Sequence, residues 1–112
     1  MRSWAAAAVL VICGVAAGHC ENVSGVGATN CADFGRTLVR VHGANAENYY
    51  FSWALGFMSA TNKYATSPRD LAAVPAERAM VAIKAYCRSH PLADYVDAVS
   101  DLWSTLPAQG AR

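Results

Sequence analysis

Apolar residues recur at helical spacing along most of the chain, and no segment alternates apolar and polar residues as a strand would. The first such pattern begins at Cys31, directly after Asn30, which is a good helix N-cap residue. It breaks over residues 42–45, where Gly43 suits a helix C-terminus. The apolar face of this predicted helix consists of Cys31, Phe34, Leu38 and Val41.

The second pattern, from about residue 46 to residue 60, is apolar on more than one side. Asn45 is its candidate N-cap, and Glu47 suits the positive end of the helix dipole. A helix that is apolar nearly all round must bury more than one face. It is therefore either the central helix of a bundle or a helix whose second stripe meets another chain. The first stripe is Tyr50, Trp53, Phe57 and Ala60, and the second is Phe51, Leu55 and Met58.

We predict that the second stripe is at least partly buried between two copies of the chain at neutral pH. A domain of this size has few elements of its own to cover both faces of one helix. This argument predicts a homodimer.

Two more helices are predicted in the C-terminal half. Residues 61–75 form a polar connection with a short turn near 70–74, and a third helix begins near Pro75 and ends before Pro91. We expect Pro91 to open a fourth helix, which Pro107 ends. The inner face of the third helix is Ala76, Ala79, Met80, Ile83 and Cys87, with Arg78, Lys84 and Arg88 outside. The apolar face of the fourth is Leu92, Tyr95, Val96, Val99, Leu102, Trp103 and Leu106, with Asp94, Asp97 and Asp101 opposite.

The beginning of the chain has the layout of a secretory signal peptide. Arg2 precedes an apolar run from Trp4 to Val15, and small residues follow up to Gly18. The run is shorter than the ~20 residues that span a bilayer. A buried first helix or a membrane anchor is the alternative. We therefore predict a signal peptide over 1–18 and export to the periplasm, a flexible tail over 19–30, a helical domain over 31–107 and a C-terminal tail over 108–112.

The cysteines bear on the same question, because an exported chain meets an oxidising compartment. Cys13 lies inside the predicted leader. Cys31 and Cys87 lie in two predicted helices that should pack together, so we predict a disulfide between them. Cys20, in the N-terminal tail, is a lipidation site, an intermolecular thiol or a residue removed by a later cut. The fold class is thus an all-α, single-domain bundle of about four helices stapled by one disulfide.

Charge and motifs argue against several function classes. The chain has nine Lys and Arg and eight Asp and Glu, and loss of Arg2 with the leader balances them. The sequence has no basic patch typical of nucleic-acid or polybasic membrane binding. Cys87 and His90 resemble half of a metal site or a thiol–histidine pair, but a disulfide and a helix cap explain them better, and a second pair for zinc is missing. We therefore expect no enzyme, no cofactor and no metal, but protein partners.

Three segments of the chain resemble one known family in order and spacing. CADF at residues 31–34 is similar to the first-cysteine signature of the HdeA/HdeB periplasmic acid-stress chaperones. The helix NYYFSWALGFM occupies the place of that family's hydrophobic central helix. IKAYCRSHPLADY, residues 83–95, looks like its second-cysteine region. The Rap/Tai-type immunity proteins, which neutralise a secreted toxin, are the alternative, because their aromatic-glycine helix and late His-Pro helix also look similar.

The chaperone resemblance implies a dimer that is idle at neutral pH and that holds unfolded clients in acid through exposed apolar surface. It carries the family's disulfide over to Cys31 and Cys87. Protonation of eight carboxylates and three histidines would take the processed chain from about 0 to about +11. The tails, ENVSGVGATN and PAQGAR, carry fewer charges than those of the known chaperones. The implied client or dimer surface is Phe51, Trp53, Leu55, Phe57 and Met58.

Overall fold

A computed structural model describes residues 23–41 and 44–110 of the chain. Helices are the only regular elements in these two ranges, which confirms the predicted all-α class. The predicted leader and Cys20 lie outside the described residues, as does Gly43. The elements are the 3-10 helix η1 (Gly25–Ala28), α1 (Cys31–Arg40), α2 (Ala44–Tyr64), the 3-10 helix η2 (Leu71–Ala73), α3 (Ala76–Ser89) and α4 (Tyr95–Thr105).

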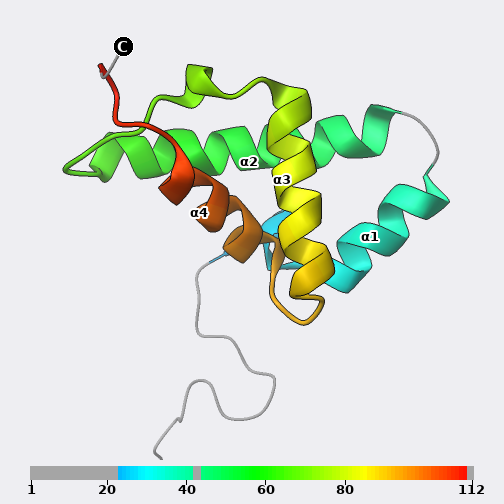
Figure 1. Cartoon of the computed structure of the whole chain (residues 1–112). Helices are drawn as coiled ribbons and strands as arrows, with labels where there is room; N and C mark the ends of the chain where they lie inside the picture. Colours follow the sequence, from blue (N-terminus) through cyan, green and yellow to red (C-terminus); the bar gives the residue numbers. More distant parts are fainter. Residues whose placement is uncertain (1–22, 42–43, 111–112) are drawn as a thin grey trace, which may run out of the picture.

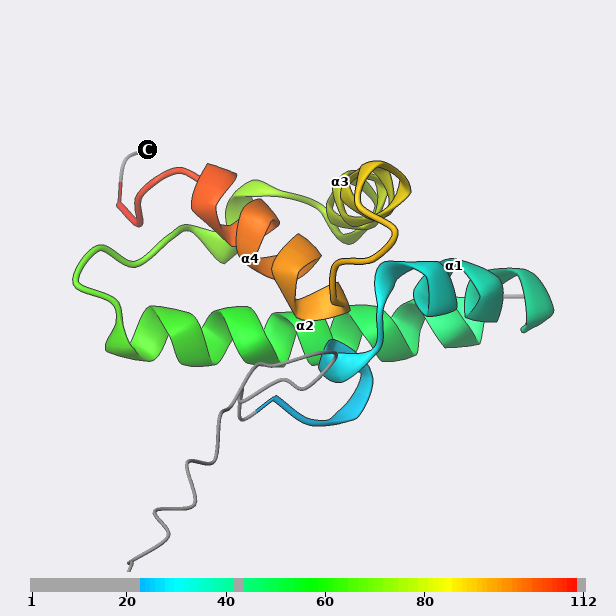
Figure 2. The ribbon, with the colours of Figure 1, turned by 90° about the horizontal axis from the view of Figure 1, so that it is seen from below.

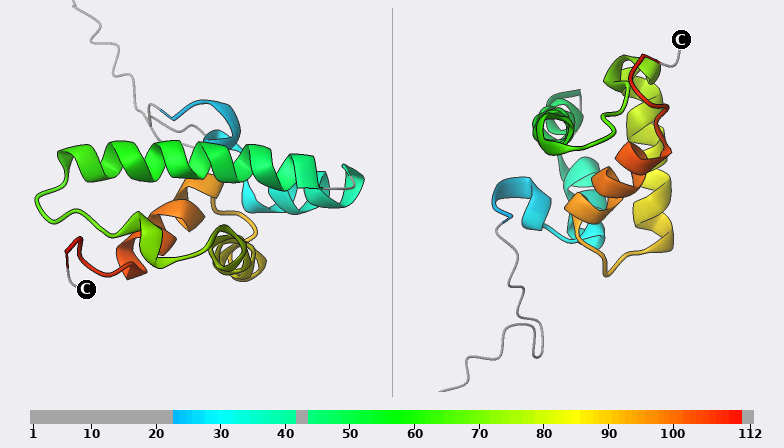
Figure 3. Two further views of the ribbon diagram at one scale, coloured as in Figure 1. Left: turned by 90° about the horizontal axis from the view of Figure 1, so that it is seen from above. Right: turned by 90° about the vertical axis from the view of Figure 1, so that its left-hand side faces the viewer.

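The long helix α2 is the element against which the others are arranged. In Figure 1, α2 runs across the molecule and α3 crosses it steeply, while α4 lies diagonally beside both. α1 packs against α3 near one end of α2. Figures 2 and 3 show η1 on the side of α2 that faces away from α3. Two sides of α2 are thus covered by different parts of the chain.

Three aromatic rings from α1, α2 and α4 meet at the centre of the core. The ring centroids of Phe34, Tyr50 and Tyr95 lie 4.8 to 5.0 Å from one another. Tyr95 is fully buried, and its hydroxyl donates a 2.9 Å hydrogen bond to the carbonyl oxygen of Tyr50. Because a buried hydroxyl needs a partner, this bond fixes α4 on α2 at one angle. Ile83 of α3 and Val99 of α4, both fully buried, extend the core.

A disulfide joins Cys31 of α1 to Cys87 of α3, with the two Cα atoms 4.8 Å apart, and this confirms the predicted pairing. Backbone hydrogen bonds surround it: Cys31 N–H donates to the Ala93 carbonyl (2.8 Å) and Tyr95 N–H to the Thr29 carbonyl (2.7 Å). We call this region, the Cys31–Cys87 bond with the backbone bonds between residues 29–32 and 91–95, the disulfide junction. It ties the start of α1 to the end of α3 and the start of α4.

The fourth helix begins four residues later than predicted. Pro91 lies in the turn between α3 and α4, and Leu92 is almost fully exposed, so neither belongs to α4. Instead, Asp94 and Asp97 form a capping box, in which the Asp94 N–H donates to the Asp97 carboxylate (2.9 Å). A reciprocal cap satisfies two free N–H groups and outweighs the preference of proline for a first helical turn.

The second helix is longer than predicted at both ends. Asn45 lies inside α2 rather than capping it, and the helix continues from Ala60 to Tyr64. The Asn62 side chain explains the later end, because it donates to the Arg69 carbonyl and accepts from the Arg69 N–H, which fixes the chain that leaves the helix. At the end of α1, Val41 is outside the helix and largely exposed, so it does not extend that apolar face.

Part of the predicted flexible tail is folded. Residues 25–28 form η1, and Gly27 is buried against α2. The folded part of the described chain therefore includes η1, ahead of Cys31. The short turn predicted at 70–74 is confirmed as η2, with the Asp70 carboxylate accepting from the Ala72 N–H.

Tyr95 gives the fold a defined response to alkali. Burial, and to a lesser degree neighbouring Tyr50, raises the pKa of the Tyr95 hydroxyl above its ordinary value. The folded chain therefore holds this proton more tightly than the unfolded chain. The stability that results is complete below the ordinary tyrosine pKa of about 10 and is lost as the pH rises above it.

We predict that Tyr95→Phe lowers the free energy of unfolding by about 1 kcal/mol at neutral pH, because the bond to the Tyr50 carbonyl is lost. Above a pH of about 10, however, the variant should lose less stability than the original chain. Urea unfolding at both pH values measures this, with the exposed Tyr64→Phe as control. Equal losses in alkali for Tyr95→Phe and the original chain would contradict the assignment.

Candidate functional site

The predicted client or dimer surface divides into three environments in the structure. Phe51, Trp53 and Phe57 are half-buried, whereas Leu55 is 38% exposed. Met58 is only 2% exposed and lies in the core. It was wrong to place Met58 on a surface that a second folded chain could contact. The predicted contact between two copies through Phe51 and Leu55 stays a prediction.

The core-facing side of α2 lies between the two predicted stripes. Tyr50, Ala54 and Met58, spaced four residues apart, are the buried line that packs on α4 and its neighbours. The sequence analysis did not identify this line, because its middle member, Ala54, is small and the aromatic residues beside it dominate the apolar pattern. Ala60, assigned to the first stripe, is exposed.

Trp53 and Phe57 form the most prominent aromatic pair on the remaining surface of α2. Their rings are stacked with centroids 5.4 Å apart and an interplanar angle of 11°. The Trp53 indole N–H donates a 3.3 Å hydrogen bond to the Ser24 carbonyl. Gly27 lies so close to the same indole that a Cβ atom there would overlap its six-membered ring. The pair is thus covered in part by residues 23–30, which we call the N-terminal segment.

The N-terminal segment was missed by the sequence reasoning because it lacks helical periodicity. The signal that it does contain is a pair of glycines, Gly25 and Gly27, ahead of an aromatic helix. Gly25 has a φ of +75°, which favours glycine, and Gly27 permits the close approach to Trp53. Both glycines are therefore needed for the segment to lie flat on the indole.

The residues considered for catalysis or metal binding have structural roles. Cys87 is in the disulfide, while His90 caps α3 and its ring is stacked on Tyr86 with centroids 4.2 Å apart. Asp94 and Asp97 form the capping box of α4, and Asp101 is exposed. Over residues 23–41 and 44–110, no three His, Cys, Asp or Glu side chains are grouped in a way that could hold a metal ion.

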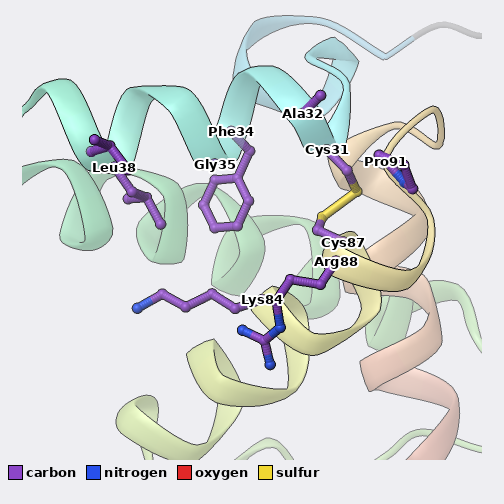
Figure 4. A pocket seen from close by; sticks show the side chains of 10 residues that line it. Cys31, Ala32, Phe34, Gly35, Leu38, Lys84, Cys87, Arg88 and Pro91 are labelled. Carbon is purple, nitrogen blue, oxygen red and sulfur yellow. A yellow bond between two sulfur atoms is a disulfide. The ribbon is translucent and has the colours of Figure 1, made fainter.

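A groove between α1 and α3 is a second surface feature that the sequence did not predict. It has a volume of about 470 Å³, and Figure 4 shows it beside the disulfide, with α1 and α3 on its two sides. Phe34 and Leu38 line the α1 side, and Lys84 and Arg88 line the α3 side. The sequence placed both cations on an outer face of the third helix but could not show which helix lies opposite. This groove is distinct from the Trp53–Phe57 surface.

None of the helices that the structure describes has both the length and the apolar character needed to cross a membrane.

The candidate site consists of two surfaces on a disulfide-stapled helical domain. One is the aromatic pair on α2, and the other is the groove between α1 and α3. In comparisons with known proteins, the chain matches no family model, no curated protein and no solved structure.

Proposed function

We propose that this protein is an exported acid-stress chaperone that binds unfolded client proteins through the aromatic surface of α2. The observation that carries the proposal is the stacked Trp53–Phe57 pair, whose indole is covered in part by the N-terminal segment. Large aromatic side chains on a helix surface suit the binding of unfolded chains, because they bind apolar segments of varied sequence. The N-terminal segment lies over the indole in the folded domain, which would keep the protein idle.

The N-terminal segment is attached beside two carboxylates at the start of α4. Thr29 and Asn30 are paired with residues 94–95 at the start of α4, which the carboxylates of Asp94 and Asp97 cap. A protonated carboxyl group is a poorer acceptor for a helix N-cap and no longer complements the helix dipole. The start of α4 and the attachment of the N-terminal segment therefore depend on two carboxylates.

Two ion pairs on the outside of the domain also depend on carboxylates. Glu47 of α2 binds Lys84 of α3 at 2.5 Å, and Asp33 binds Arg36 within α1. Both pairs are partly exposed, so each contributes little by itself. Their loss leaves the cations unpaired on a chain whose net charge is rising, and the resulting repulsion favours a more open state. The disulfide limits how far that opening can go.

We predict that the purified protein suppresses aggregation of several unrelated proteins at about pH 3, below the usual ionisation range of carboxyl groups, but not at pH 7. Light scattering of acid-denatured clients with and without the protein measures this. A protein that shows no suppression at any pH from about 2 to 5 would not be an acid-activated chaperone. Tight binding of a single toxin at neutral pH would instead support an immunity protein.

A second prediction concerns a variant that should expose Trp53 without acid. Gly27→Ala places a Cβ where the Trp53 ring lies, so the N-terminal segment must move away from the indole. We expect the variant to bind an apolar dye and unfolded clients at neutral pH, where the original chain does not. Tryptophan emission should shift to the red, because the indole becomes hydrated.

The matched control is Gly56→Ala, since Gly56 lies on α2 and a Cβ there meets no atom within 4 Å. It should leave dye binding unchanged and should stabilise the helix by up to about 1 kcal/mol. Adding Trp53→Ala to Gly27→Ala should abolish the gain in client binding. A folded Gly27→Ala variant that binds no more dye or client than Gly56→Ala would show that the covered aromatic pair is not the client site.

A further inference from the structure

The groove between α1 and α3 combines an apolar base with a cationic rim. Half-buried Leu38 and Val39, which is 71% exposed, provide apolar surface over the buried ring of Phe34, and the disulfide closes one end. Gly35 also lines the groove, and a Cβ there would project into open space with nothing within 4 Å.

The charges at this groove all have one sign. Lys84 and Arg88 line it, and an adjoining depression on α1 is lined by Arg36 and Arg40. No Asp or Glu side chain lines either depression. Lys84 is paired with Glu47 and Arg36 with Asp33, so Arg88 is the cation of the α1–α3 groove for which no carboxylate partner is present in the described residues. The groove is therefore complementary to an anion that also has apolar surface.

The dimensions favour a small amphiphile over a partner helix. A volume of about 470 Å³ lies in the range of small-molecule sites, which are mostly apolar with a few polar groups that orient the ligand. A helix is about 10–12 Å across with its side chains and would rest on the rim without filling the space beside the disulfide. A flexible hydrocarbon chain can follow the narrow path between α1 and α3.

The geometry points to a binding site for the anion of a long-chain fatty acid. The alkyl chain lies along Phe34, Leu38 and Val39, and the carboxylate is held by the guanidinium of Arg88. A guanidinium binds a carboxylate with two parallel hydrogen bonds, so Arg88 gives the site its selectivity for this head group. The site is occupied at neutral pH and is independent of the aromatic surface of α2.

Calorimetric titration of the purified protein with dodecanoate at pH 7, below the concentration at which dodecanoate forms micelles, tests the inference. We expect saturable binding at one site. Dodecanol, which keeps the chain but lacks the charge, should bind about tenfold or more weakly, because a hydrogen bond to a charged group is lost. Acetate, which has the charge without the chain, should show no saturable binding. Binding of acetate as tight as that of dodecanoate, or binding only to anionic phospholipid vesicles, would overturn the proposal.

Two pairs of variants locate the site. Gly35→Phe fills the groove and should abolish dodecanoate binding, whereas Gly35→Ala should retain it. Arg88→Gln should weaken binding about tenfold, whereas Arg78→Gln, an exposed arginine on the same helix outside the groove, should not. Circular dichroism confirms that each variant is folded. Dodecanoate affinity that is unchanged in folded Gly35→Phe and Arg88→Gln would place the ligand elsewhere and overturn the assignment.

Discussion

The Cys31–Cys87 disulfide is the constraint on which the other contacts of this domain depend. It links two residues that are 56 positions apart, and closing a loop of that length stabilises a fold by about 4 kcal/mol in the chain-entropy account. That is a large share for a domain of this size, whose core is small. The bond sets the start of α1 beside the end of α3, so that Phe34 reaches Tyr50 and Tyr95.

The two proposed binding surfaces lie on either side of the disulfide junction and differ in what covers them. The groove is bounded by the disulfide itself and by two helices, so it is preformed. Trp53 on α2 is covered in part by the N-terminal segment. The segment is held by the hydrogen bond from Trp53, the close fit of Gly27, the packing of Val26 on the core and the backbone bonds of Thr29 and Asn30 at the disulfide junction. Local opening costs the least free energy where few buried contacts must be broken. Acid activation as proposed requires that the N-terminal segment leaves the indole before the helices separate.

Helical periodicity and caps were enough to predict the four helices and the disulfide pairing. Asn30 caps α1 as expected, with its side chain accepting from the Asp33 N–H, and Leu106 and Pro107 follow the end of α4. The start of α4 was wrong because both Pro91 and Asp94 are good start signals, and only the reciprocal bond between Asp94 and Asp97 decides between them. The bounds of α2 were wrong because Asn45 is compatible with both a cap and a helical position.

The surfaces were harder to predict than the elements, because they depend on distances between helices. The apolar stripes of α2 did not show that Met58 lies in the core, nor that Trp53 and Phe57 are only half-buried. The roles of Gly27 and Gly35 could not be predicted from the sequence, because the role of a glycine depends on which residues lie next to it in space. The cations of α3 could be identified in the sequence. The groove that they line could not be predicted, because it depends on where α1 lies.

The central claim is that acid releases the N-terminal segment from α2 while the disulfide-joined body stays folded. Hydrogen exchange measured by mass spectrometry, at neutral pH and in acid, tests it directly. The account predicts that peptides covering residues 23–30 lose protection in acid, whereas peptides from α3 and from the second half of α4 retain it. Loss of protection in all helices together, or retained protection in residues 23–30, would contradict the account.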